Sequence, residues 1–183
     1  MHSAPSKTSN PSHERAELTT ERLVLRTWTA AEAGAVLAGD GRRPGGWAED
    51  FPAEGDRVIA GLFDGHPAWL GPYGHRLLVE RSTGLVVGSI GLFWPPAEGV
   101  LELGYGVVAS RRGRGYATEA TRALAAYGLA APGVHTVTAG VELSNPASVR
   151  VLEKAGFERY GAAPAEEAEG VLRFRLTRPA PRE

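Results

Sequence analysis

The segment VVASRRGRGYATEATRAL, residues 107–124, constrains the fold of this chain more than any other. It runs from an apolar stretch typical of a strand, through a turn rich in glycine and arginine, into a stretch with helical periodicity. A glycine-rich turn before a helix leaves backbone N–H groups uncovered, and the helix dipole adds partial positive charge there. The sequence therefore predicts a strand–turn–helix unit that can hold an anion.

Two common phosphate-binding motifs do not fit this turn. A Walker-type loop ends in Gly-Lys-Ser/Thr, whereas residues 115–117 are Gly-Tyr-Ala. A dinucleotide-binding fingerprint needs a third small residue in register and an acidic residue about 20 positions further on, where this chain has HTVT. The pattern Gly104-Tyr-Gly106-Val-Val-Ala109 resembles that fingerprint, but it lies inside a predicted strand and opens no helix. Both kinds of site are therefore excluded.

The remaining segments alternate between strand-like and helix-like patterns. We expect strands in ERLVLRTW, in the two halves of YGHRLLVERSTGLVVGSIGLFW, in VLELGYGVV, in HTVTAGVEL and in VLRFRLT. We expect helices from the capping box Thr29–Glu32 to Leu37, in DRVIAGLF, in ATEATRALAAYGLA, and in NPASVRVLEKAG with Asn145 as N-cap and Gly156 as C-cap. The fold class is therefore α/β, with a mixed, mostly antiparallel twisted sheet and flanking helices.

Composition and charge favour one soluble domain. A chain of 183 residues that is 43% apolar and 22% charged can build one sizeable core, expected over residues 17–178, with tails at 1–16 and 179–183. The net charge of −1 gives no general attraction to nucleic acid or to an anionic membrane. The absence of cysteine excludes disulfides and thiolate catalysis, and the scattered histidines predict no metal site. We expect a cytoplasmic protein.

Two motifs resemble those of the GNAT superfamily of N-acetyltransferases. Arg112-Gly-Arg-Gly115-Tyr-Ala117 matches the signature R/Q-x-x-G-x-G/A between a strand and a helix. Residues 145–157, NPASVRVLEKAGF, resemble the second motif, N-x-x-S-x-x-x-x-x-K-x-G-F. Together with ELGY before the signature and TERLVLR near the start, they make residues 18–177 most similar to the ribosomal-protein N-terminal acetyltransferase branch. The resemblance implies the GNAT fold.

The resemblance also implies acetyl-CoA as cosubstrate. Its pyrophosphate would bind the turn at Arg112, Gly113, Arg114, Gly115, Tyr116 and Ala117, and its pantetheine arm would pair like a strand with the backbone near Tyr105 and Val107. The Asn145 side chain would bind the pantetheine arm, in addition to capping its helix or instead of capping it. We expect Arg112 to face the cofactor and Arg111 to be a solvated part of the turn.

Acetyl transfer to an amine needs a base, stabilisation of an oxyanion and stabilisation of the departing thiolate. Glu102 is the candidate base because it is a carboxylate in the apolar strand LELGY, and a water could relay the proton; the alternative is a solvent-facing side chain. Glu142 is the reserve candidate. Ser148 is the candidate partner of the sulfur, since Leu152 stands where many superfamily members have tyrosine; alternatively its hydroxyl bonds its own backbone.

The expected activity is therefore transfer of an acetyl group from acetyl-CoA to a primary amine by direct attack in a ternary complex. The acceptor is a protein N-terminus or a small-molecule amine, the loop around Trp47 borders the acceptor site in this family, and a homodimer is compatible with the sequence. A second interpretation is an acyl-CoA sensor that has lost catalysis. Nucleic-acid binding by RRGR is disfavoured, because no aromatic residues interleave with the arginines.

Overall fold

The computed structural model describes residues 17–39, 44–161 and 170–179. The strands are β1 (Leu18–Thr19), β2 (Leu23–Thr27), β3 (His75–Glu80), β4 (Val86–Leu92), β5 (Val100–Val107), β6 (Thr136–Glu142), β7 (Glu158–Tyr160) and β8 (Val171–Thr177). The helices are α1 (Ala30–Ala38), α2 (Glu54–Leu62), α3 (Tyr116–Ala130) and α4 (Pro146–Lys154), with 3-10 turns η1 (Pro67–Leu70) and η2 (Ala109–Arg111). The expected tails, except for residue 179, lie outside the described residues.

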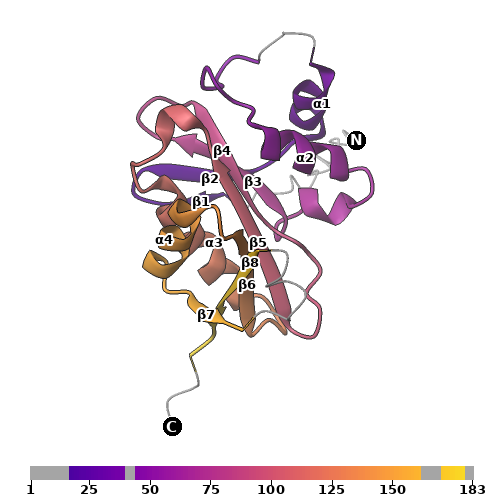
Figure 1. Ribbon diagram of the computed structural model, residues 1–183. Helices are drawn as coiled ribbons and strands as arrows, with labels where there is room; N and C mark the ends of the chain where they lie inside the picture. Colours follow the sequence, from indigo (N-terminus) through magenta and orange to yellow (C-terminus); the bar gives the residue numbers. More distant parts are fainter. Residues whose placement is uncertain (1–16, 40–43, 162–169, 180–183) are drawn as a thin grey trace, which may run out of the picture.

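The strands form one mixed sheet in the order β1-β2-β3-β4-β5-β6-β8-β7. Neighbouring strands are antiparallel, except that β5 and β6 run parallel. Helices α3 and α4 lie on one side of the sheet, and α1 and α2 lie on the other (Figure 1). The prediction of a mixed, mostly antiparallel sheet with flanking helices is confirmed.

The parallel pair β5–β6 separates partway along its length. Its ladder runs from Val100–Thr136 to Glu102–Thr138, although both strands continue for several residues. Beyond this point, within the described residues, β5 pairs with β4 and β6 pairs with β8. Over residues 105–107, alternate N–H and C=O groups of β5 therefore point into a gap between the two strands.

Helix α3 packs closely on the sheet and brings its first turn to the end of β5. Ala120 and Leu124, which lie four residues apart on one face of this helix, are fully buried. A Cβ atom added to Gly128 would lie 3.0 Å from a methyl group of Leu92, so the helix and the sheet approach too closely for a larger residue. This packing fixes the position of the turn that precedes the helix.

The two predicted N-caps are found, whereas several helix ends differ from the prediction by one or two residues: α1 extends to Ala38, and α2 spans Glu54–Leu62 rather than residues 56–63. Thr29 and Glu32 form the expected capping box of α1, and Asn145 caps α4. The C-cap of α4 is Ala155 rather than Gly156. Gly156 follows with φ of +91°, because glycine adopts the left-handed conformation one residue after the helix has ended.

Candidate functional site

A cleft of about 570 Å³ opens between the end of β5, the turn after it, the start of α3 and one face of α4. Its lining includes most of the residues expected to bind a cofactor: Tyr105, Val107, Arg112, Gly113, Gly115, Tyr116, Ala117 and Asn145, together with Ser148. Arg114 and Glu102 do not line it. The structure thus brings the two sequence motifs together on opposite walls of one cleft.

The start of α3 faces this cleft without a side-chain cap. Its N-cap is Gly115, at φ +81°, and no side chain of the described residues caps it. The first main-chain bond of the helix runs from the Glu119 N–H to the Gly115 carbonyl at 3.0 Å, so the N–H groups of residues 116–118 have no partner within the helix. Gly113 is also left-handed, at φ +73°. This geometry favours an anion at the helix N-terminus.

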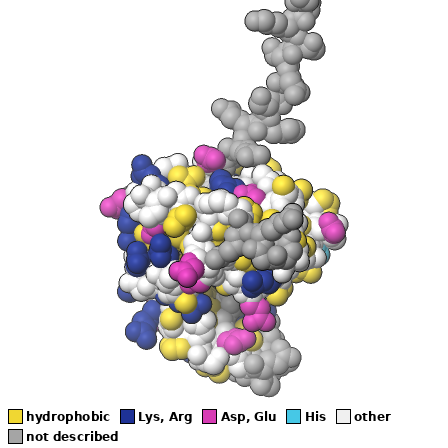
Figure 2. Space-filling model, turned by 90° about the horizontal axis from the view of Figure 1, so that it is seen from above, with side chains coloured by type: hydrophobic (Ala, Val, Ile, Leu, Met, Phe, Trp, Pro, Cys, Tyr) yellow, Lys and Arg dark blue, Asp and Glu magenta, His cyan; other side chains and the backbone are white. Residues whose placement is uncertain are grey.

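Four cationic side chains line the cleft from two sides. Arg111 and Arg112 belong to the turn, and Arg150 and Lys154 lie about one helical turn apart on α4. Figure 2 shows Lys and Arg side chains gathered on the side of the molecule where α3 and α4 lie in Figure 1. The Nε atom of Arg112 donates to the Val107 carbonyl at 3.0 Å, which folds this side chain back over the end of β5. A nearly neutral chain therefore has a locally cationic cleft.

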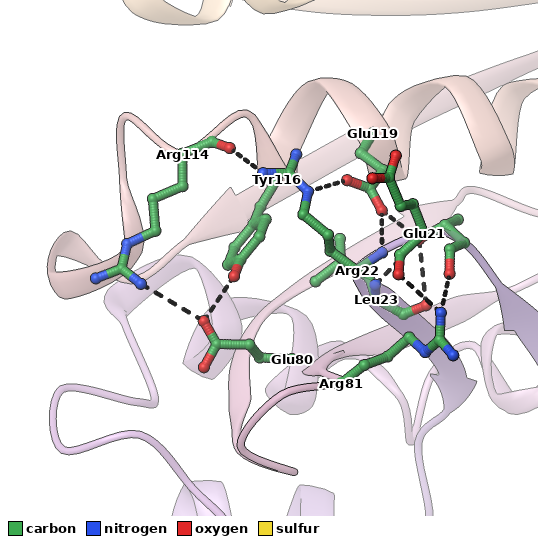
Figure 3. A network of polar contacts seen from close by, with 9 residues as sticks. Glu21, Arg22, Leu23, Glu80, Arg81, Arg114, Tyr116 and Glu119 are labelled. Atoms are coloured by element: carbon green, nitrogen blue, oxygen red, sulfur yellow. Dashed lines mark hydrogen bonds and ion pairs between the residues drawn. The ribbon is translucent and has the colours of Figure 1, made fainter.

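A buried carboxylate, Glu80, ties the turn to the sheet (Figure 3). It accepts hydrogen bonds from the Tyr116 hydroxyl at 2.7 Å and the Thr83 hydroxyl at 2.6 Å. Arg111 Nε and Arg114 Nη1 lie 3.3 Å and 3.7 Å from its Oε1. Burial acts to raise the pKa of Glu80, but the bonds from Thr83 and Tyr116 and the charge of Arg111 outweigh it and lower the pKa. Glu80 therefore holds these groups as an ionised carboxylate.

Two arginines of the turn, Arg111 and Arg114, do not lie where the sequence predicted. Arg111, expected to be solvated, lines the cleft and is only 20% exposed, because it pairs with Glu80. Arg114 is 51% exposed and also faces Glu80, outside the cleft lining. Within the turn, the backbone direction at each residue decides which arginine points inward, and spacing in the sequence does not reveal it.

The start of α4 forms the opposite wall. Asn145 Oδ1 accepts a hydrogen bond from the Ser148 N–H at 3.1 Å, so Asn145 caps the helix, and its amide nitrogen keeps donors that this bond does not use. The Ser148 carbonyl accepts a hydrogen bond from the Tyr105 hydroxyl at 3.2 Å, which joins α4 to β5. Burial raises the pKa of Tyr105. Leu152 is fully buried in the core and does not line the cleft.

The two carboxylates considered as bases lie outside the cleft lining. Glu102 stands where β5 and β6 separate, and its side chain is 49% exposed and pairs with Arg173 of β8 at 3.3 Å. It precedes Tyr105 by three residues, roughly 10 Å along the strand. Glu142 is exposed and accepts a hydrogen bond from the Ser144 hydroxyl at 3.2 Å.

Arg150 and Glu80 were not predicted as site residues, and Lys154 was recognised only as the lysine of the second motif, without a role. Arg150 and Lys154 are four residues apart in the second motif, and helical spacing alone could have placed them on the face that carries Ala147 and Val151. Glu80 has no such signal, because the residue it holds, Tyr116, is 36 positions away.

Neither a metal site nor a membrane span is found in the described ranges. No group of three or more His, Cys, Asp or Glu side chains there could hold a metal ion. None of the helices there is long and apolar enough to cross a bilayer.

The sequence matches the family model of the acetyltransferase (GNAT) domain over residues 22–158. Among curated proteins, "Probable N-acetyltransferase YjcK" of Bacillus subtilis (strain 168) is 37% identical over 92 residues, which cover 49% of this chain and 50% of that protein. The chain spans about half the length of the curated relatives it matches.

Solved structures match over most of the chain. The "putative ribosomal-protein-serine acetyltransferase from Vibrio cholerae" gives a TM-score of 0.63 at 20% identity and covers 88% of this chain and 97% of that one. A GNAT-family acetyltransferase from Bacillus anthracis gives 0.61 at 21% identity and covers 88% and 98%. At these identities the likeness shows a common fold.

Proposed function

The chain belongs to the GNAT acetyltransferase family, and we propose that it transfers the acetyl group of acetyl-CoA to a primary amine by direct attack in a ternary complex. The family model covers both of the motifs from which the family was expected. The observation that carries the proposal is the cleft itself, where an uncapped helix start, four cations and the edge of β5 beyond its ladder with β6 lie together.

The pyrophosphate and the pantetheine arm of acetyl-CoA each have a counterpart in this cleft. The N–H groups of residues 113–118 and the side chains of Arg111 and Arg112 suit a pyrophosphate, which carries negative charge. The edge of β5 at residues 105–107 can pair with the amide groups of pantetheine as a neighbouring strand would. The Asn145 amide lies on the opposite wall and can donate to the same arm. The thioester would then point toward the apex of the gap, which is the place beside Glu102 where β5 and β6 separate.

Glu102 and Ser148 supply the proposed chemistry. An amine with an ordinary pKa is mostly protonated at pH 7 and must lose a proton to attack. Glu102, at the apex, would take that proton directly or through a water while the amine nitrogen bonds to the acetyl carbon. The C–S bond then breaks, and the proton that the amide nitrogen still has to lose passes to the departing thiolate, to which the Ser148 hydroxyl, at the cleft wall, would donate a hydrogen bond.

The acceptor class is proposed in two forms. The name of the Vibrio cholerae structural neighbour refers to a ribosomal-protein serine, which supports a protein N-terminus as the first acceptor to test. A small-molecule amine uses the same chemistry, because only the primary amine takes part in bond formation.

A second candidate function is an acyl-CoA sensor without catalysis. It is favoured by one observation, the exposed ion pair of Glu102 with Arg173 outside the cleft lining.

The test is an acetyl-CoA-consumption screen read by thiol release, with peptide N-termini and small amines as acceptors. The chain has no cysteine, so every thiol detected belongs to CoA. Calorimetric titration with acetyl-CoA runs beside it. Thiol release with an acceptor supports the transferase, tight binding without release for any acceptor supports the sensor, and no binding contradicts both.

A further inference from the structure

The turn between β1 and β2 contacts the glycine-rich turn from outside the cleft, through Arg22. The Nη1 atom of Arg22 donates to the Arg114 carbonyl at 2.7 Å, and its guanidinium lies 5.0 Å from the centre of the Tyr116 ring (Figure 3). Arg22 does not line the cleft, so it is not placed to contact a ligand there. Its strongest contact with the site is thus through a main-chain carbonyl.

That contact fixes the direction of one peptide group. In a trans peptide the C=O and the following N–H point in opposite directions. Because Arg22 holds the Arg114 carbonyl on the outer side, the N–H of Gly115 points to the other side, and Gly115 lines the cleft. We infer that Arg22 is a positioning residue that presents the Gly115 N–H to the pyrophosphate; this rests on the proposed function.

The alternative orientation is open to this peptide without Arg22. Gly115 follows the peptide bond, and glycine tolerates the large φ changes that a flip requires. A flipped peptide would turn the Arg114 carbonyl toward the cleft, where its negative end opposes an anion. Arg22 also packs against the glycine itself, since a Cβ atom added to Gly115 would lie 3.3 Å from Arg22 Nη2.

Arg22 is itself held in place by Glu119 of α3. The Glu119 carboxylate accepts hydrogen bonds from the Arg22 N–H, from Arg22 Nε and from the Thr20 hydroxyl, each at 2.7 Å. Burial acts to raise the pKa of Glu119, but these donors outweigh it and lower the pKa. The guanidinium therefore has one edge on a carboxylate and the other on the Arg114 carbonyl, a geometry that the planar fork of arginine allows and a single ammonium does not.

The test compares the binding of two ligands to variants of Arg22 and Arg81. Arg22→Met keeps an apolar stem and removes the donors, and the matched control is Arg81→Met. Arg81 belongs to the same network, but its guanidinium donates to the carbonyls of Thr20 and Glu21, away from the glycine-rich turn. Dissociation constants are measured by calorimetry for acetyl-CoA and for S-acetylpantetheine, which has no pyrophosphate.

We expect Arg22→Met to weaken acetyl-CoA binding about 10-fold or more, because the hydrogen bond from the Gly115 N–H to the charged pyrophosphate is lost. Binding of S-acetylpantetheine should change less than about 2-fold, and Arg81→Met should leave both constants near those of the unmodified protein. Arg22→Lys should resemble Arg22→Met, since one ammonium cannot serve both acceptors. A crystal structure of Arg22→Met should show the peptide between residues 114 and 115 rotated.

Three outcomes overturn the inference while leaving the proposed function standing. They are unchanged acetyl-CoA affinity in Arg22→Met, equal losses for both ligands, or equal losses in Arg22→Met and Arg81→Met, which would indicate general loosening of the strand pair. Failure of the unmodified protein to bind acetyl-CoA would instead contradict the proposed function itself.

Discussion

The hydroxyl of Tyr116, in the first turn of α3, donates a hydrogen bond to Oε1 of Glu80 at the end of β3, at 2.7 Å. Both side chains are buried. The bond therefore fastens the glycine-rich turn to the end of β3, and it raises the pKa of Tyr116 because the ionised phenol would face a carboxylate.

Tyr116→Phe removes this bond and leaves Glu80 with Thr83 and the arginines. We expect the free energy of unfolding to fall by about 1.5–3 kcal/mol, the usual worth of a hydrogen bond to a charged group. Urea unfolding followed by tryptophan fluorescence measures it. Tyr160→Phe, on the edge strand β7, is the control, and an equal loss in both variants would show that the Glu80 bond adds nothing.

Gly115→Val should weaken acetyl-CoA binding more than it weakens the fold. The φ of +81° is strained for a β-branched residue, and the added atoms would meet Arg22. Binding is measured by thermal shift with excess acetyl-CoA, since a ligand of the native state raises the melting temperature. Gly34→Ala, in α1 with nothing within 4 Å of the added Cβ, should keep the full shift. A normal shift in folded Gly115→Val would place the anion site elsewhere.

Glu102→Gln should keep acetyl-CoA affinity and lower turnover on a confirmed acceptor by about 10²–10⁴, the range for a positioned base. The loss should shrink as the pH rises, because the amine then deprotonates unaided. A pH–rate profile checks this. A loss of the same size at every pH would mean that Glu102 positions the acceptor, and full turnover would remove it from the chemistry.

Ser148→Ala should lower turnover about 10-fold or more if its hydrogen bond to the thiolate strengthens in the transition state. The low-pH limb of the profile should stay in place, since that limb reports the base. Substrate affinity should change little, so the loss should fall on kcat rather than on KM. Unchanged kcat would mean that Ser148 does not stabilise the departing thiolate and that main-chain groups do so.

His75 should make the protein less stable as the pH falls from about 6.5 to about 4. Burial lowers its pKa from 6.5 to about 4, so the unfolded chain binds a proton in this window while the folded one does not. The full effect is up to roughly 3 kcal/mol. The slope of melting temperature against pH should be flatter in His75→Asn than in the unmodified protein, and parallel slopes would contradict the effect.

Local elements and the family could be predicted from the sequence, because they depend on residues near each other. The capping box at Thr29, the cap at Asn145 and the strand–turn–helix at residues 107–124 are all of this kind. The short elements β1, β7, η1 and η2 were not predicted, since two to four residues carry too little periodicity.

The polar supports of the site could not be predicted for a different reason. Glu80 and Tyr116 are 36 positions apart, and Arg22 and Arg114 are 92 apart, so only the folded sheet brings them together. The same applies to the arginines of the turn, whose directions depend on the left-handed conformations of Gly113 and Gly115.

The separation of β5 from β6 after Glu102 and Thr138 makes the width of the gap between them depend on core packing. The two walls of the gap belong to different halves of the sheet, and they meet at a short joint packed around Leu101 and Val137, both fully buried. The packing of these two residues sets the angle at which β5 and β6 diverge. In the proposed transferase, apolar residues that touch no substrate would therefore set the width of the opening for the acyl group and the acceptor.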